Sequence, residues 1–244
     1  GEPALELSFS NVVTDVQCYG GADGIIEVIA SGGTAPYQYS KNGGATYQIN
    51  PIFNNLVSGT YQIMIKDAHN CVSDMSTVFV DSPSELPNFS TNNTNILCHG
   101  SNTGEIIINA NGGFPPYTYS INGGLSFQTS NTFSNLYAGS YDVMIRDSHL
   151  CNSLISTITL TEPSSSISFT VSTVDVECFG YNSGELIINA SGGNPPYTYS
   201  INGGTTFQVS NLFENLLAGT YNVLVKDASL CVSSISLVTI AQPS

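Results

Sequence analysis

Hydrophobic and polar residues alternate along most of this chain, with the period of two that is typical of β-strands. No stretch shows the 3.6-residue period of a helix of ordinary length. Gly-Gly and Asn-Gly-Gly sequences separate the alternating segments and favour tight turns with positive φ. In the first third of the chain the pattern predicts about seven short strands, among them strands near residues 5–13, 24–30, 36–40, 46–49, 59–66 and 76–80.

The same pattern occurs three times, at intervals of 80 residues. Cysteines and prolines mark the repeat most clearly: Cys18, Cys98 and Cys178; Cys71, Cys151 and Cys231; Pro83, Pro163 and Pro243. The prolines favour module boundaries that give residues 1–83, 84–163 and 164–244. About seven short strands in each module are typical of an immunoglobulin-like β-sandwich. We therefore expect an all-β chain of three tandem immunoglobulin-like β-sandwich modules, joined by short, proline-stiffened linkers into an elongated rod.

The charge balance excludes one class of partner. Four Lys and Arg residues stand against eighteen Asp and Glu residues, and the net charge of −14 would repel a phosphate backbone. We therefore expect no binding of nucleic acid. Only 9% of the residues are charged, so solubility depends on Ser, Thr, Asn and Gly, as suits an extracellular protein. No apolar run reaches the roughly 20 residues of a membrane-spanning helix, and the chain opens with Gly1 and no signal sequence, so we expect a fragment of a longer protein.

Each module has two cysteines, which form no CxxC pair and, together with the histidines, are too few for a zinc site. We expect all six in disulfides, each contributing roughly 4 kcal/mol, and hence an oxidising compartment. In a standard sandwich, Cys18 and Cys71 lie near opposite ends, about 20 Å apart, whereas a disulfide needs Cα atoms within about 7 Å. Either the first strand is split, or the bonds join adjacent modules, for instance Cys18 with Cys151. We favour pairing within each module, because each module then balances its own cysteines.

Two sets of tyrosines recur in all three modules. Tyrosines two residues apart on one strand face the same way, and we expect them in the core rather than on a platform for stacking sugars. These pairs are Tyr37 and Tyr39, Tyr117 and Tyr119, and Tyr197 and Tyr199. Tyr61, Tyr141 and Tyr221 end a Leu-x-x-Gly-x-Tyr sequence. This sequence resembles the tyrosine corner of such sandwiches, in which the phenol bonds to upstream backbone.

Asp67, Asp147 and Asp227 are the acidic residues that recur in every module. A turn in which Asp bonds its own backbone explains them. Calcium is the alternative, with Asp15, Asn95 and Asp175 as further ligands, but calcium needs several oxygen ligands and one Asp in a loop falls short of that. We expect no cofactor other than this weak calcium candidate. His69 and His149 have no counterpart in the third module, where Ser229 stands, and no catalytic motif recurs, so we expect no enzyme.

One combination of motifs is specific. It comprises Cys98-His99-Gly100, Gly104-Glu105-Ile106, the run at 112–120, Gly139-Ser140-Tyr141, and Asp147 with Cys151; the other modules match it from Cys18 to Cys71 and from Cys178 to Cys231. This combination resembles the SprB repeat over nearly the whole chain. The resemblance implies very large cell-surface adhesins of gliding bacteria, exported by type IX secretion. It carries over no catalytic residue.

The repetition and the resemblance lead to one functional expectation. We expect a structural and adhesive repeat segment of a large adhesin on the outer surface of a bacterium, involved in gliding motility and surface attachment. Its partners would be neighbouring repeats of the same chain and surface polysaccharide or the substratum. The alternatives are an array of carbohydrate-binding modules and a stalk stiffened by calcium.

Overall fold

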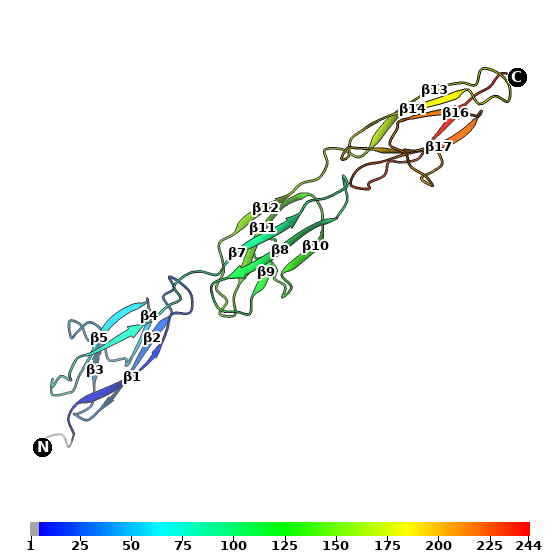
Figure 1. Ribbon diagram of the computed structural model, residues 1–244. Helices are drawn as coiled ribbons and strands as arrows, with labels where there is room; N and C mark the ends of the chain where they lie inside the picture. Colours follow the sequence, from blue (N-terminus) through cyan, green and yellow to red (C-terminus); the bar gives the residue numbers. More distant parts are fainter. Residues whose placement is uncertain (1–4) are drawn as a thin grey trace. The chain divides into compact units, whose positions relative to one another are not determined.

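The computed structural model describes residues 5–244, which form β-strands and connecting loops (Figure 1). Within these residues there are eighteen strands and no helix, and thus no helix that could cross a membrane. Corresponding strands of the three repeats begin 80 residues apart. The bounds are β1 Ser8–Thr14, β2 Gly24–Ser31, β3 Gln38–Ser40, β4 Ile52–Leu56, β5 Gly59–Lys66, β6 Ser76–Val80, β7 Asn88–Thr94, β8 Gly104–Asn111, β9 Thr118–Ser120, β10 Thr132–Leu136, β11 Gly139–Arg146, β12 Ser156–Leu160, β13 Ser168–Val174, β14 Gly184–Ser191, β15 Thr198–Ser200, β16 Leu212–Leu216, β17 Gly219–Lys226 and β18 Ser236–Ile240.

Each set of six strands forms two antiparallel sheets of three strands. In the first set the orders are β1-β2-β4 and β3-β5-β6, and the other two sets repeat them. Strands one, two and four therefore lie in one sheet, and strands three, five and six in the other. This is the distribution of strands A, B, E and C, F, G in an immunoglobulin-like sandwich. The predicted all-β, immunoglobulin-like fold is confirmed.

The core of the first sandwich follows from the alternation in its sequence. Ile26 and Val28 of β2 are buried, and so are Ile63 and Ile65 of β5 in the facing sheet. Together with Phe53 of β4 they belong to one hydrophobic cluster. Burial of each such side chain contributes about 1.5–3 kcal/mol, so the two inner faces hold the sheets together.

The strand prediction is wrong in two places. Each repeat has six strands rather than seven, because residues 46–49 contribute only a bridge between Gln48 and Tyr39, with backbone hydrogen bonds of 2.8 and 2.9 Å. The alternation also fails to predict β4. Asn55 adopts a φ of 57° and the pairing of β4 with β2 shifts register, so the buried positions of β4 lie three residues apart instead of two.

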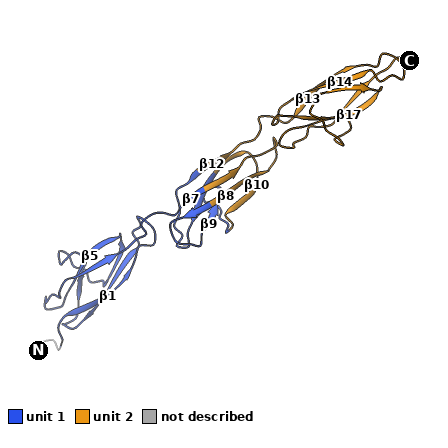
Figure 2. Ribbon diagram, in the orientation of Figure 1, with its two compact units in different colours: residues 1–90, 109–129, 142–156 blue, residues 91–108, 130–141, 157–244 orange. Residues whose placement is uncertain are grey.

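The chain divides into two compact units (Figure 2). Unit 1 comprises residues 1–90, 109–129 and 142–156, and unit 2 comprises residues 91–108, 130–141 and 157–244. Residues 1–4 of the first predicted module lie outside the described residues, and the boundaries after residues 83 and 163 stay predictions. Each disulfide lies within one unit, Cys18–Cys151 in unit 1 and Cys98–Cys231 in unit 2.

Candidate functional site

The two cysteines of one repeat lie at opposite ends of its sandwich. Cys18 follows β1, and the end of β1 is bonded to the end of β6 through Val16 N–H and Asp81 O, at 2.9 Å. Cys71 lies in the loop that precedes β6, so it belongs to the other end. The eight residues of β5 span about 26 Å between the two ends.

The disulfides therefore join successive repeats. Cys18 bonds to Cys151, with a Cα–Cα distance of 5.6 Å. Cys98 bonds to Cys231, at 5.7 Å and with the same sequence separation of 133 residues. The pairing within each module, which the sequence analysis favours, is wrong, because a strand length separates the two cysteines. The chain leaves one sandwich at the end that carries the first cysteine and enters the next at the end that carries the second.

Two of the six cysteines form no disulfide in the described chain. Cys71 and Cys178 are free and exposed in this chain, so four of the six expected cysteines are bonded within the described residues. The bonded counterparts of Cys71 are more covered, since Cys151 is only 3% exposed and Cys231 is half-buried. The adjoining repeat therefore shields the second cysteine once the junction has formed.

A buried carboxylate fixes the loop that presents the second cysteine. Asp67 Oδ1 accepts hydrogen bonds from the backbone N–H groups of His69 and Cys71, at 2.8 and 2.9 Å, and Oδ2 accepts one from Thr34 at 3.1 Å. Burial alone would raise the pKa of Asp67. The three hydrogen bonds outweigh that effect, with a smaller contribution from the charge of His69, and hold the pKa below its ordinary value of 3.8. The carboxylate therefore stays charged and orders the cysteine backbone.

These hydrogen bonds give the repeated aspartates the role of turn residues that bond their own backbone. Asp147 and Asp227 make the same three bonds in their own repeats. The residues suggested as further calcium ligands lie at the other end of the sandwich. The side chain of each accepts a hydrogen bond from the backbone N–H of the residue after the last strand of its repeat; these residues are Asp15, Asn95 and Asp175. Within residues 5–244, no group of three His, Cys, Asp or Glu side chains is placed to hold a metal ion.

A glycine beside the carboxylate is a functional residue that the sequence analysis assigns only to a turn. Gly33 has a φ of 57°, and a Cβ atom there would lie 3.2 Å from Asp67 Oδ2. At Gly113 and Gly193 the corresponding distances to the carboxylate are 2.7 and 2.6 Å. A side chain would therefore displace the carboxylate from the amides that it holds. The signal in the sequence is that the Gly-Gly doublet and the aspartate recur together.

The first cysteine of each repeat lies in a tight turn. The backbone oxygens of Cys18, Cys98 and Cys178 accept hydrogen bonds from the N–H three residues later, at 2.9, 2.9 and 3.1 Å. The glycine two residues after each cysteine has a positive φ, of 70°, 73° and 78°. The turn thus has one backbone form in all three repeats, whether or not its cysteine is bonded.

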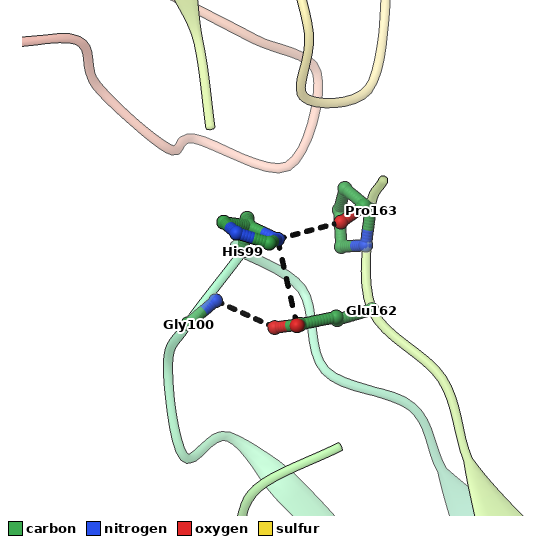
Figure 3. A network of polar contacts seen from close by, with 4 residues as sticks. All are labelled: His99, Gly100, Glu162 and Pro163. Atoms are coloured by element: carbon green, nitrogen blue, oxygen red, sulfur yellow. Dashed lines mark hydrogen bonds and ion pairs between the residues drawn. The ribbon is translucent and has the colours of Figure 1, made fainter. Parts of the chain in front are cut away.

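Polar contacts tie this turn to the segment that leaves the repeat, as Figure 3 shows for the second one. Glu162 accepts a hydrogen bond from Gly100 N–H, and its other oxygen lies 3.5 Å from His99 Nδ1. His99 Nδ1 also contacts Pro163 O at 2.9 Å. In the third repeat, Gln242 accepts the equivalent bond from the glycine of the turn, at 3.0 Å. The side chain before the boundary proline therefore positions the loop of the first cysteine.

A model of one protein family, described as the SprB repeat, matches the chain at residues 10–46, 90–126 and 170–206. Each match covers most of the first strand, the cysteine turn, the second strand and the Gly-Gly doublet. The chain contains three SprB repeats. The family and the tandem arrangement support a repeat segment of a surface protein. No curated protein matches the sequence.

Solved structures similar to the chain include tandem arrays of small domains. The N-terminal eight Ig domains of Down Syndrome Cell Adhesion Molecule match with 12% identity and a TM-score of 0.37, over 100% of this chain and 37% of theirs. The chicken CNTN1 FN1-FN3 domains match with 13% identity and a TM-score of 0.28, over 99% and 100%. Domains 4–9 of the surface layer protein SbsC match with 12% identity and a TM-score of 0.28, over 100% and 48%. The chain spans well under half the length of the first of these, and at such low TM-scores the likenesses carry no argument about function.

In each SprB repeat, the tyrosine that ends the Leu-x-x-Gly-x-Tyr sequence makes the hydrogen bond of a tyrosine corner. Its phenol donates to the backbone oxygen four residues upstream: Tyr61 to Val57 at 2.9 Å, Tyr141 to Tyr137 at 2.9 Å, and Tyr221 to Leu217 at 2.8 Å. This bond fastens the start of the fifth strand to the corner that precedes it.

The paired tyrosines of each SprB repeat pack against the core. Tyr39 is 8% exposed, and burial, followed by the nearby Tyr37, raises the pKa of Tyr39 above 10.0. Tyr37 packs against the same cluster and donates to Gly32 O at 2.7 Å. Tyr117 and Tyr197 donate to the equivalent glycines, and Tyr119 and Tyr199 are half-buried with pKa values shifted upward in the same way, first by burial. The pairs therefore offer no exposed platform of rings for a sugar.

Proposed function

We propose that this chain is a force-transmitting and adhesive repeat segment of a bacterial cell-surface adhesin that takes part in gliding motility, and that it is not an enzyme. One observation carries the proposal: each disulfide joins one SprB repeat to the next instead of closing a single repeat. A bond within a sandwich stabilises only that sandwich. A bond between sandwiches keeps successive repeats connected by a second covalent path when one of them unfolds, which is an advantage under tension.

Adhesion in this proposal comes from the number of repeats. Weak contacts of each SprB repeat with surface polysaccharide or with the substratum add up when many repeats act together, because every contact after the first forms at high effective concentration. An elongated rod of repeats would hold these contacts away from the cell. The location is the outer surface of the bacterium, reached through type IX secretion, where disulfides persist in an oxidising environment.

Antibody fragments against the oxidised chain test this proposal on living cells. Fab fragments should label intact, unpermeabilised cells of the source organism, and should slow both gliding and attachment to glass. Fab fragments against an abundant cytoplasmic protein of the same cells are the control and should do neither. Labelling that requires permeabilised cells would contradict the proposed location. Surface labelling with unchanged gliding and attachment would contradict the proposed role.

A further inference from the structure

The chain forms the same junction twice: the first cysteine of one repeat bonds to the second cysteine of the next repeat. Each of the two free cysteines corresponds to one side of this junction. Cys71 corresponds to Cys151 and Cys231, which are bonded to the preceding repeat. Cys178 corresponds to Cys18 and Cys98, which are bonded to the following repeat. The first repeat thus presents one half of the junction, and the third repeat presents the other half.

Both halves already have the geometry of the bonded junctions. The loop of Cys71 is held by Asp67, with Cys71 N–H donating to Oδ1 at 2.9 Å and Asp67 N–H donating to Cys71 O at 3.0 Å. The bonded Cys151 and Cys231 have the same two hydrogen bonds, at the same distances. The Cys178 turn likewise has the backbone hydrogen bond and the positive-φ glycine of the two bonded turns. No loop therefore has to refold before a bond forms.

The formed junctions show how the partner covers the second cysteine. Cys151 Sγ lies 3.4 Å from Gln17 O, and Cys231 Sγ lies 3.5 Å from Leu97 O, each in the residue just before the partner cysteine. Asn194 Nδ2 also donates to Leu97 O, at 3.3 Å. A repeat that docks on Cys71 would make the same approach through the residue before its own first cysteine, which is Glu177 in the third repeat.

We propose that the disulfide ladder extends beyond the two bonds of this chain: Cys71 bonds to the first cysteine of a further SprB repeat, and Cys178 bonds to the second cysteine of another. A second copy of this chain supplies such a repeat, through a head-to-tail bond from Cys178 of one copy to Cys71 of the other. The contact is heterologous, so it leaves one open cysteine at each end and the ladder continues. An oxidant of low molecular weight, such as oxidised glutathione, supplies the chemistry. The two protein thiols lose two protons and two electrons as the Sγ–Sγ bond forms, and the glutathione disulfide breaks and becomes two thiols. The inference rests on the junction geometry alone and is independent of the adhesive role.

Two single variants test the direction of the bond. Cys71→Ser retains only the Cys178 thiol, and Cys178→Ser retains only the Cys71 thiol. In oxidised glutathione, a mixture of the two should give a covalent dimer on a non-reducing gel, about tenfold above the dimer of either variant alone, because docking raises the effective concentration of the matched thiols. The unsubstituted chain should give a series of higher multiples, and the variant that lacks both cysteines should stay monomeric.

Peptide mapping completes the experiment. It should find the Cys178–Cys71 peptide in the mixed dimer, and the Cys18–Cys151 and Cys98–Cys231 peptides in every variant, which shows that each variant has folded. Equal amounts of mixed dimer and of the single-variant dimers would overturn the inference, because thiols that react at random show no preference. Absence of any dimer from correctly folded variants, whose single thiols still react with a soluble thiol reagent, would overturn it as well.

Discussion

At the scale of single residues, the side chain of Asp67 orders the loop of the second cysteine. Its carboxylate accepts three backbone hydrogen bonds from two separate loops. Because the pKa of Asp67 is lower in the folded chain than its ordinary 3.8, its stabilisation is fully present above about pH 4 and is lost as the pH falls through the folded value.

The Asp67→Asn variant tests this dependence. An amide NH₂ in place of Oδ2 cannot accept from Thr34 N–H, so the variant should be less stable than the original chain at pH 7. It should also lose less of its remaining stability between pH 4 and pH 2. Urea midpoints across this range measure both effects, and Asp74→Asn, at an exposed position of the same loop, is the control. A decline parallel to that of the original chain would show that Asp67 does not carry the pH dependence.

The residue before the second cysteine has a positive φ in every repeat. The first repeat places Asn70 there, at 64°, whereas the others place Leu150 and Leu230, at 65° and 66°. A leucine in this conformation costs roughly 1–2 kcal/mol, and Leu150 is 72% exposed, so little burial offsets the cost. Leu150→Asn should therefore stabilise the chain by about 0.5–1 kcal/mol, and the reverse change Asn70→Leu should destabilise it by a similar amount. Thermal unfolding of both variants measures this, and two shifts of the same sign would refute the backbone explanation.

At the scale of elements, the tyrosine corner fastens the fifth strand of each sandwich. Tyr141→Phe removes only the hydroxyl that donates to Tyr137 O, and should cost about 1 kcal/mol. Tyr137→Phe is a matched control, because its backbone oxygen remains and its ring is 59% exposed, so its effect should stay within about 0.5 kcal/mol. Urea unfolding followed by circular dichroism compares them. Equal losses would mean that the hydrogen bond contributes nothing beyond the ring.

Elements with strict alternation are predictable from the sequence, and those with irregular backbone are not. β5 and β6 lie where the pattern places them, since every second residue of β5 from Tyr61 to Ile65 faces inward. β4 is missed because Asn55 breaks the period of two by its positive φ. The cysteine spacing shows that a bond within one sandwich conflicts with its length. Choosing the correct partner requires knowledge of which end of one sandwich leads into the next, and this follows from the hydrogen bond between the ends of β1 and β6.

At the scale of the whole molecule, the two disulfides enclose overlapping loops, 18–151 and 98–231. The shortest covalent path between the termini runs along residues 1–18, crosses to Cys151, runs back to Cys98, and crosses to Cys231. Under tension this path is the first to become fully extended. Within the second repeat it runs from Cys151 back to Cys98, which is opposite to the N-to-C direction of the chain. Most residues of the first and third repeats then lie in slack segments outside the path, so their unfolding adds little length.

Pulling a single molecule by its termini tests this path. The path contains about 86 residues, so the unfolded, oxidised chain should reach about 300 Å, against about 850 Å for the reduced chain of 244 residues. Cys98→Ser should lengthen the oxidised limit to about 390 Å, because only the bond from Cys18 to Cys151 then remains. Cys178→Ser is the decisive control. If the bonds join successive repeats, this variant should still extend to about 300 Å. If the bonds lay within each repeat, it would extend to about 490 Å. An extension of that length would contradict the bonding between repeats.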